Sequence, residues 1–202
     1  QAREAITVAV TFDGRTETLS LRDGRGEALL PMEVLAAPGA APLELRTAAS
    51  LTRLSLPVQE GQFPTYHIPQ ETGGGILNDA GKVRAETQRM AELFVQRSEP
   101  AWPGRARFRL PYDGELLPTA PFGQRRTYGN SPAVSAHAGQ DYSAAPGTPV
   151  YAPARGKVVL AEALFVRGNA VVLDHGGGVY TGYWHLSEID VVQTGGAGPL
   201  GS

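Results

Sequence analysis

Apolar and polar residues alternate along the first quarter of the chain with the two-residue period of β-strands. Residues 5–12, 16–21 and 51–56 alternate in this way, and β-branched side chains are frequent in them. Asp13-Gly14 and Asp23-Gly24 are turn dipeptides, and residues 28–35 and 43–45 are further candidate strands. The pattern predicts a small antiparallel β-module over residues 1–57, with strand spacing like that of an immunoglobulin fold.

The next part of the chain, residues 58–104, is predicted to be a connector that contains one helix. Its first half is interrupted by Gly and Pro, and a helical period then runs over about residues 79–97, capped by Asn78 or Asp79. Charged residues such as Glu86 are expected to face water. The expected packing face consists of Val83, Met90 and Phe94, with Thr87 between them.

From residue 105 to residue 202 the pattern returns to short strands that are separated by Gly-rich turns. Residues 150–160, 169–178 and 179–187 give the strongest strand signals. This density of strands and turns predicts an antiparallel β-domain. The expected fold class is therefore mostly β: an N-terminal β-module, a connector with a helix, and a C-terminal β-domain.

Composition excludes several classes of function. The formal net charge of -2 gives no basic surface for nucleic acid or an anionic membrane. No apolar run approaches the ~20 residues that span a bilayer. Cysteine is absent, which excludes disulfides, thiolate zinc ligands and a cysteine nucleophile.

A histidine and a carboxylate, His137 and Asp141, are separated by a short run that contains Gly139. The surrounding Pro and Gly disfavour a helix, so the segment is expected to be extended, with residues 137, 139 and 141 on one face of a strand. An imidazole nitrogen and a carboxylate oxygen over a residue without a side chain suit zinc. The alternative is a hydrogen-bonded pair on the surface.

Two further histidines lie in the last strands. His185 shares its expected strand face with Tyr183 and Thr181, which favours a polar site; the alternative is a half-buried histidine bonded to a neighbour. His175 precedes three glycines at a strand end and is interpreted as a residue that shapes the turn, not as a ligand.

Five segments follow one another in the order and spacing of a known family. They are FGQR (122–125), HAGQD (137–141), APGTPVYAPARGKVV (145–159), GNAVVLDHG (168–176) and YWHLS (183–187). Over about residues 105–195 the chain resembles the lysostaphin-type, LytM-like zinc endopeptidases, which are bacterial cell-wall hydrolases. The upstream β-module, connector and helix also resemble the N-terminal region of secreted members of that family.

The resemblance implies zinc-dependent cleavage of peptide bonds in the cross-links or stems of peptidoglycan, outside the cytoplasm: secreted, periplasmic or in the cell envelope. His137 and Asp141 match the first two zinc ligands, and His185 matches a catalytic histidine. Arg125 and Tyr128 match the loop that borders the substrate groove. Such a zinc ion lowers the pKa of its water towards ~7 and polarises the scissile carbonyl.

The sequence departs from this family at one point. A His-x-His segment, which carries the third zinc ligand, is expected after the strand of His185, but residues 188–202 contain no histidine. Three explanations stand: the complete protein has further residues, the chain has been shortened (GPLGS at 198–202 resembles a tag scar), or the protein is a natural non-catalytic relative. The retention of His137, Asp141 and His185 favours the first two.

Two other functions remain as alternatives. The domain could be a non-catalytic LytM-like module that binds the wall or activates a separate amidase partner. It could also be a structural β-protein without a metal, in which His137 and Asp141 have no joint role.

Overall fold

The computed structural model describes residues 6–21, 23–69, 79–98, 108–132, 134–190 and 199–201. The chain divides into two compact units, each of which is described by itself. The first contains residues 1–66, 121–127 and 133–140, and the second contains residues 67–120, 128–132 and 141–202. Antiparallel strands predominate, so the mostly-β fold class is confirmed. The expected boundaries of 1–57, 58–104 and 105–202 stay a prediction.

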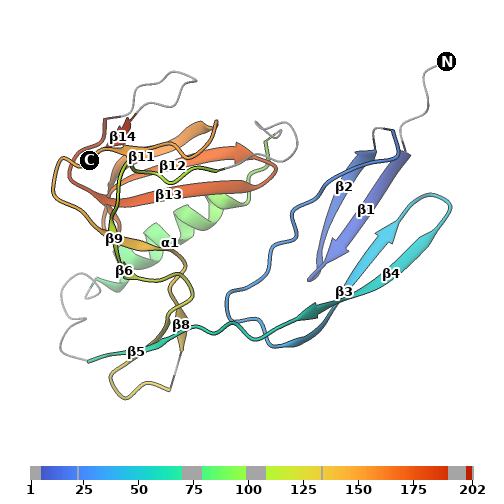
Figure 1. Cartoon of the computed structure of the whole chain (residues 1–202), viewed down its shortest axis with the longest axis horizontal. Helices are drawn as coiled ribbons and strands as arrows, with labels where there is room; N and C mark the ends of the chain where they lie inside the picture. The colour runs from blue at the N-terminus through green and yellow to red at the C-terminus, as the bar shows by residue number, and fades with distance from the viewer. Residues whose placement is uncertain are drawn as a thin grey trace. The chain divides into compact units, whose positions relative to one another are not determined.

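The first unit is built on a four-stranded sheet with the order β2-β1-β3-β4 (Figure 1). Asp13 and Gly14 join β1 to β2 with φ angles of 47° and 71°, the left-handed values that a type I′ hairpin turn requires at both positions. The predicted turn is therefore confirmed. The strands are β1 (Ile6–Phe12), β2 (Arg15–Leu21), β3 (Gly39–Arg46) and β4 (Leu51–Val58).

Residues 28–35, predicted as a strand, are not one. Both edges of β1 are already paired, one with β2 and one with β3. Residues 28–35, which connect β2 to β3, therefore have no free edge of β1 with which to pair. Ala28 and Leu29 instead lie beside Val10 and Phe12, two buried core residues of this unit. These four strands form one sheet and not the two packed sheets of an immunoglobulin sandwich.

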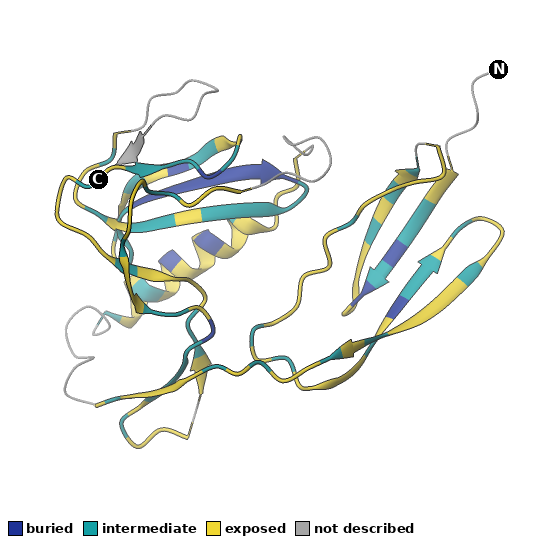
Figure 2. Ribbon diagram, in the orientation of Figure 1, coloured by how far each residue is buried: buried dark blue, intermediate teal, exposed yellow. Residues whose placement is uncertain are grey.

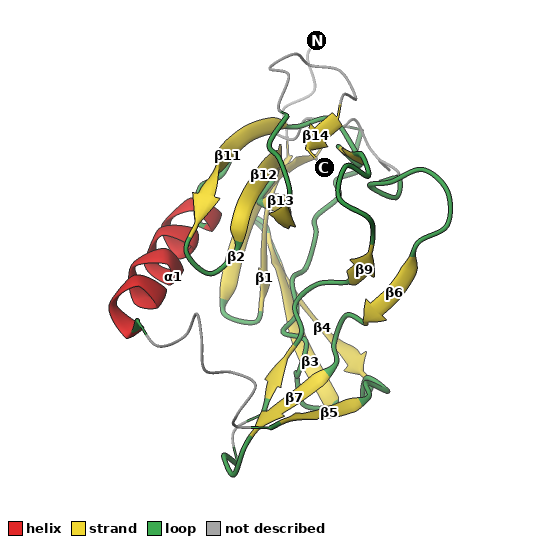
Figure 3. Ribbon diagram, turned by 90° about the vertical axis from the view of Figure 1, so that its left-hand side faces the viewer, coloured by secondary structure: helices red, strands yellow, loops and turns green. Residues whose placement is uncertain are grey.

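The second unit is built on the sheet β11-β12-β13 and the helix α1, which runs along one face of that sheet (Figures 1 and 3). Neighbouring strands are antiparallel, as expected. The central strand, β12, is dark blue over most of its length in Figure 2, which marks it as buried. The elements are α1 (Ala80–Phe94), β11 (Lys157–Leu164), β12 (Gly168–Gly176) and β13 (Val179–Leu186).

The two faces of β12 pack against different clusters. Ala170 and Val172 lie in the cluster that includes Met90 of α1. Val171 and Leu173 lie in a second cluster on the opposite face, with Ala152, Val158, Tyr183, Leu186 and Ile189 at its edge. Because successive side chains of a strand point to opposite faces, a continuous apolar run is what such a doubly covered strand requires.

The helix begins as predicted but buries an unexpected residue. Asp79 caps it, accepting a hydrogen bond from the backbone N–H of Lys82 at 3.0 Å. The alternative cap, Asn78, lies outside the described residues. Phe94 is 40% exposed, whereas Glu86 is only 6% exposed. The expectation that Glu86 faces water is therefore wrong.

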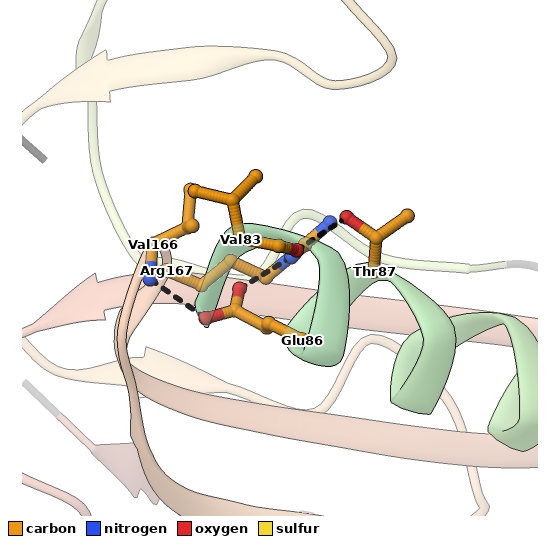
Figure 4. A network of polar contacts seen from close by, with 5 residues as sticks. All are labelled: Val83, Glu86, Thr87, Val166 and Arg167. Carbon is orange, nitrogen blue, oxygen red and sulfur yellow. Dashed lines mark hydrogen bonds and ion pairs between the residues drawn. The ribbon is translucent and has the colours of Figure 1, made fainter. Parts of the chain in front are cut away.

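The reason for the burial of Glu86 lies in the turn between β11 and β12 (Figure 4). Its carboxylate accepts a hydrogen bond from the backbone N–H of Val166 at 2.6 Å and forms an ion pair with Arg167. A helical period places residues 83, 86, 90 and 93 on one face, and Glu86 can occupy the middle of that face only because both oxygens find donors.

Several short strands complete the fold. β5, β7 and β8 form one sheet in that order, β6 pairs with β9, and β10 pairs with β14. No helix in the described ranges is long and apolar enough to cross a bilayer. The short strands are β5 (Thr65–Ile68), β6 (Leu117–Ala120), β7 (Arg125–Tyr128), β8 (Ser135–Ala136), β9 (Asp141–Ser143), β10 (Val150–Tyr151) and β14 (Pro199–Gly201).

Replacement of Glu86 by Ala is expected to lower the free energy of unfolding of the second unit by about 2–3 kcal/mol. The change leaves Arg167 and the N–H of Val166 without their carboxylate. Urea unfolding measures the effect. The control is Glu92→Ala, which removes an exposed carboxylate bonded to Gln88 and should cost less than about 0.5 kcal/mol. Equal losses for the two variants would contradict the structural role of Glu86.

Candidate metal and catalytic site

His137 follows β8 directly and is held by the neighbouring loop through its backbone. Its N–H donates to the carbonyl oxygen of Gln124 at 2.9 Å, and its own carbonyl accepts from the N–H of Gly123 at 2.8 Å. The half-buried ring places Nδ1 3.2 Å from the carbonyl oxygen of Pro121. A carbonyl oxygen only accepts hydrogen bonds, so Nδ1 carries a proton, and in the neutral form of the ring Nε2 is the nitrogen with the lone pair.

This tautomer is the one that a metal-binding histidine uses when its other ring nitrogen is anchored to a carbonyl. Gly139 lies on the Nε2 side of the ring, where a Cβ at that position would stand 3.8 Å from Nε2. Imidazole nitrogen and carboxylate oxygen are both zinc donors, so the residue types at positions 137 and 141 fit the ion.

Asp141 begins β9 and lies opposite Ala120 of β6. The expectation that residues 137, 139 and 141 lie on one face of a single strand is wrong. The chain leaves β8 after Ala136, bends at Gly139 and enters β9, which pairs with a different partner strand. The bend interrupts the alternation on which the expectation relied. His137 belongs to the first unit and Asp141 to the second, so their pairing as ligands stays a prediction.

His185 lies in β13 at an irregularity of the ladder. Between the pairs Asn169–Leu186 and Val171–Tyr183, β12 advances by two residues and β13 by three, so β13 bulges there. His185 has φ 58°, a left-handed value that is rare for a residue with a side chain, and its N–H donates to the carbonyl of Arg167 at 2.8 Å. Tyr183 and Leu186 both pack on the Val171 face, so the expected alternation does not continue through His185.

Sequence reasoning missed the role of His175, which it treated as a turn residue. The side chain is fully buried: Nδ1 lies 2.6 Å from the carbonyl oxygen of Arg155, and Nε2 lies 2.9 Å from Oγ1 of Thr181. Nδ1–H must donate to the carbonyl, so Thr181 donates to Nε2 and in turn accepts from the hydroxyl of Tyr183 at 3.0 Å. The sequence did carry a signal for this burial, because position 175 continues the alternation of the buried residues Val171 and Leu173.

Burial raises the pKa of Tyr183 to about 12, although the hydrogen bond to Thr181 acts in the opposite direction. The phenol therefore remains protonated at neutral pH and continues to donate to Thr181. This chain of hydrogen bonds fixes the part of β13 that leads into His185.

The two residues expected to border the groove lie on β7. Nη2 of Arg125 donates to Oε1 of Glu60 at 3.2 Å. Tyr128 ends the strand, is 42% exposed, and accepts a hydrogen bond at its carbonyl from the N–H of Ser131. Their substrate contacts stay a prediction. Within the described ranges, no group of three or more His, Cys, Asp or Glu residues is arranged to hold a metal ion.

Comparison with known proteins matches residues 135–197 to Peptidase family M23. A stretch of 85 residues, 42% of the chain, is 38% identical to the peptidoglycan DD-endopeptidase ShyA of Vibrio cholerae. A stretch of 96 residues, 47% of the chain, is 35% identical to an uncharacterized metalloprotease of Haemophilus influenzae. Each stretch covers only 20% of the length of the relative it matches.

A solved structure from Pseudomonas aeruginosa, described as a peptidase M23, superimposes with a TM-score of 0.61 at 24% identity. The superposition covers 96% of this chain and 72% of that one. At this identity the likeness concerns the fold alone. Together with the family match, these findings confirm the resemblance to LytM-like peptidases.

Two substitutions of His185 are expected to show how much backbone strain this position carries. His185→Gly should unfold no more easily than the natural chain, because glycine adopts positive φ without the strain of roughly 1 kcal/mol that a side chain brings. His185→Val should lose about 1–2 kcal/mol, because a β-branched residue fits this conformation worst. Thermal and urea unfolding measure both, and equal stability of the two variants would exclude strain at this position.

The raised pKa of Tyr183 predicts a loss of stability in strong base. The folded-state pKa of about 12 lies above the ~10 of an unfolded tyrosine, so between these values the unfolded state holds fewer protons. The contribution is fully present below pH 10 and declines as pH rises towards 12. Urea unfolding of the natural chain and of Tyr183→Phe from pH 8 to 12 isolates it. A stability difference that is constant over this range would contradict the shift.

Proposed function

We propose that this chain, whose residues 135–197 match Peptidase family M23, provides the peptidase domain of a zinc-dependent endopeptidase that hydrolyses peptide bonds of bacterial peptidoglycan. The carrying observation is the anchored ring of His137, whose Nδ1 lies 3.2 Å from the carbonyl oxygen of Pro121, the arrangement in which metal-binding histidines bond a carbonyl through their other ring nitrogen. The name of the Vibrio relative supports the substrate class. A secreted, periplasmic or cell-envelope location follows from that substrate.

His137 and Asp141 would hold the ion through an imidazole nitrogen and a carboxylate oxygen. The remaining protein ligand would come from the His-x-His segment that the family resemblance implies. When bound, zinc supplies a Lewis acid that polarises the scissile carbonyl and acidifies a water molecule. Two protein ligands alone would hold it weakly, since a structured site with all its ligands is what gives high affinity.

His185 would act beside the metal as a proton carrier. Its imidazole is exposed, so substrate and solvent can reach it. Its backbone is fixed in an uncommon conformation by the bulge and by the bond to Arg167. Fixed, strained residues of this kind are concentrated at catalytic sites, where preorganisation outweighs the cost in stability. The proposed role is to take a proton from the attacking water and deliver it to the leaving amine.

A second function is supported by the same family match. Under this alternative the domain is a LytM-like module that binds the wall or activates an amidase partner without cleaving anything itself. Such a module would still bind purified wall material and would release no peptides from it.

The test is zinc content and peptide release from purified sacculi, measured on the protein expressed from its whole coding sequence. His137→Ala should lower zinc affinity by more than about 100-fold, because changes outside the ligand shell alone cost about 10–100-fold. The same variant should release no peptides, and its zinc content should fall in parallel. His67→Ala, at an exposed histidine of β5, is the matched control and should alter neither.

Failure of the zinc-loaded natural protein to release peptides would reject the enzyme and leave the binding module. Release that persists unchanged in folded His137→Ala would reject His137 as a ligand. Asp141→Asn provides an independent variant, because it removes the charge of the second proposed ligand while preserving the shape of the side chain.

A further inference from the structure

Along one edge of the Arg125 guanidinium, only one of the two nitrogens has a hydrogen-bond acceptor. Nη2 donates to Glu60 at 3.2 Å, but Nε is buried and finds no hydrogen-bond acceptor among the described residues. The N–H groups of Nε and Nη2 point the same way, and a carboxylate that lies squarely against them accepts two parallel hydrogen bonds. The edge is therefore shaped for a second bond that Glu60 does not make.

The ion pair with Glu60 is a weak one. The side chain of Glu60 is 66% exposed and that of Arg125 is 35% exposed, so water screens the attraction. The separation also exceeds the 2.7–2.9 Å usual for charge-assisted hydrogen bonds. Another carboxylate could take the place of Glu60 at little cost.

The backbone holds Glu60 close to this place. The N–H of Arg125 donates to the carbonyl of Pro64 at 2.8 Å, and Phe63 packs edge-on against Phe122 with ring centroids 6.1 Å apart. A Cβ on Gly123 would stand 2.2 Å from the Phe63 ring, so only glycine permits this contact. The segment that carries Glu60 therefore lies against the loop that carries Arg125.

The same loop supports the proposed metal ligand. Gly123 and Gln124 form both backbone hydrogen bonds to His137, and Arg125 pairs with Ala136 in the β7–β8 ladder. An open depression of about 370 Å³ is lined by Leu35, Thr65, Arg125 and Val134. Leu35 and Val134 are exposed and offer apolar surface in the depression that Arg125 also lines.

We propose that Arg125 is a specificity-determining residue that binds a free carboxylate of the peptide substrate, and that Glu60 is an internal competitor for this position. The incoming carboxylate replaces Glu60 and bonds both Nη2 and Nε, so one negative charge is exchanged for another. The aliphatic part of the peptide lies on Leu35 and Val134. This inference rests on the proposed peptidase function, because it assigns a preference to the same substrate.

The experiment measures binding, by calorimetry, of one soluble wall peptide in two forms: with its carboxylates free and with them converted to methylamides. The natural protein should prefer the free form. Arg125→Ala should weaken binding of the free form about tenfold or more and leave the amidated form unchanged. Arg125→Lys keeps the charge without the fork and should fall between the two.

Glu60→Gln should tighten binding of the free form severalfold and leave the amidated form unchanged, since it removes the competitor. The matched control is Glu44→Gln, which breaks an exposed ion pair with Arg53 in the same unit and should change neither affinity. Circular dichroism and thermal unfolding identify the variants that fold, and Arg125→Lys serves if Arg125→Ala does not.

Equal affinity for the two peptide forms, no binding of either, or unchanged preference in a folded Arg125 variant would overturn the proposal. Hydrolysis is measured on the same samples. A protein that prefers the free carboxylate but cleaves nothing would support the role of Arg125 and contradict the proposed enzyme activity. A protein that binds and cleaves both forms equally would support the enzyme activity and contradict the carboxylate site.

Discussion

The second unit depends on the burial of β12 on both faces. The residues from Ala170 to His175 are all buried, with α1 against one face and the Val171–Tyr183 cluster against the other. A strand in this position cannot leave a polar group without a partner, because water does not reach it. The constraint extends to every polar side chain that enters either cluster.

Three buried polar residues meet this constraint, and each has at least one partner that is distant in sequence. Glu86 bonds to Val166 and Arg167. Oδ2 of Asp174 accepts from the hydroxyl of Ser98, and Oδ1 accepts from the N–H of Gly176. His175 bonds to Arg155 and Thr181. The bonds to Val166, Ser98 and Arg155 join segments outside the sheet's strands to the buried groups, so satisfying these groups also fixes the chain around the sheet.

The candidate site residues lie where this regular structure is interrupted. His185 occupies the bulge of β13, and His137 follows the short strand β8 just before the bend at Gly139. Bulges and strand ends let a side chain leave the pleated surface and reach solvent, while the neighbouring ladder keeps its backbone in place. The rigid sheet therefore fixes the orientation of these residues, and the irregular positions give their side chains access to solvent.

The sequence by itself determined the features that depend on neighbouring residues. The Asp13-Gly14 turn, the cap at Asp79, the strands β11 to β13 and the motifs of the LytM-like family were all readable, because turn geometry, capping and alternation act over a few positions. Tertiary structure alone decided the burial of Glu86, the bend that separates His137 from the strand of Asp141, and the bulge at His185. The physical reason is distance along the chain: Glu86 is buried because Arg167, 81 residues away, neutralises it, and strands bend or bulge according to the partners that the fold brings to their edges.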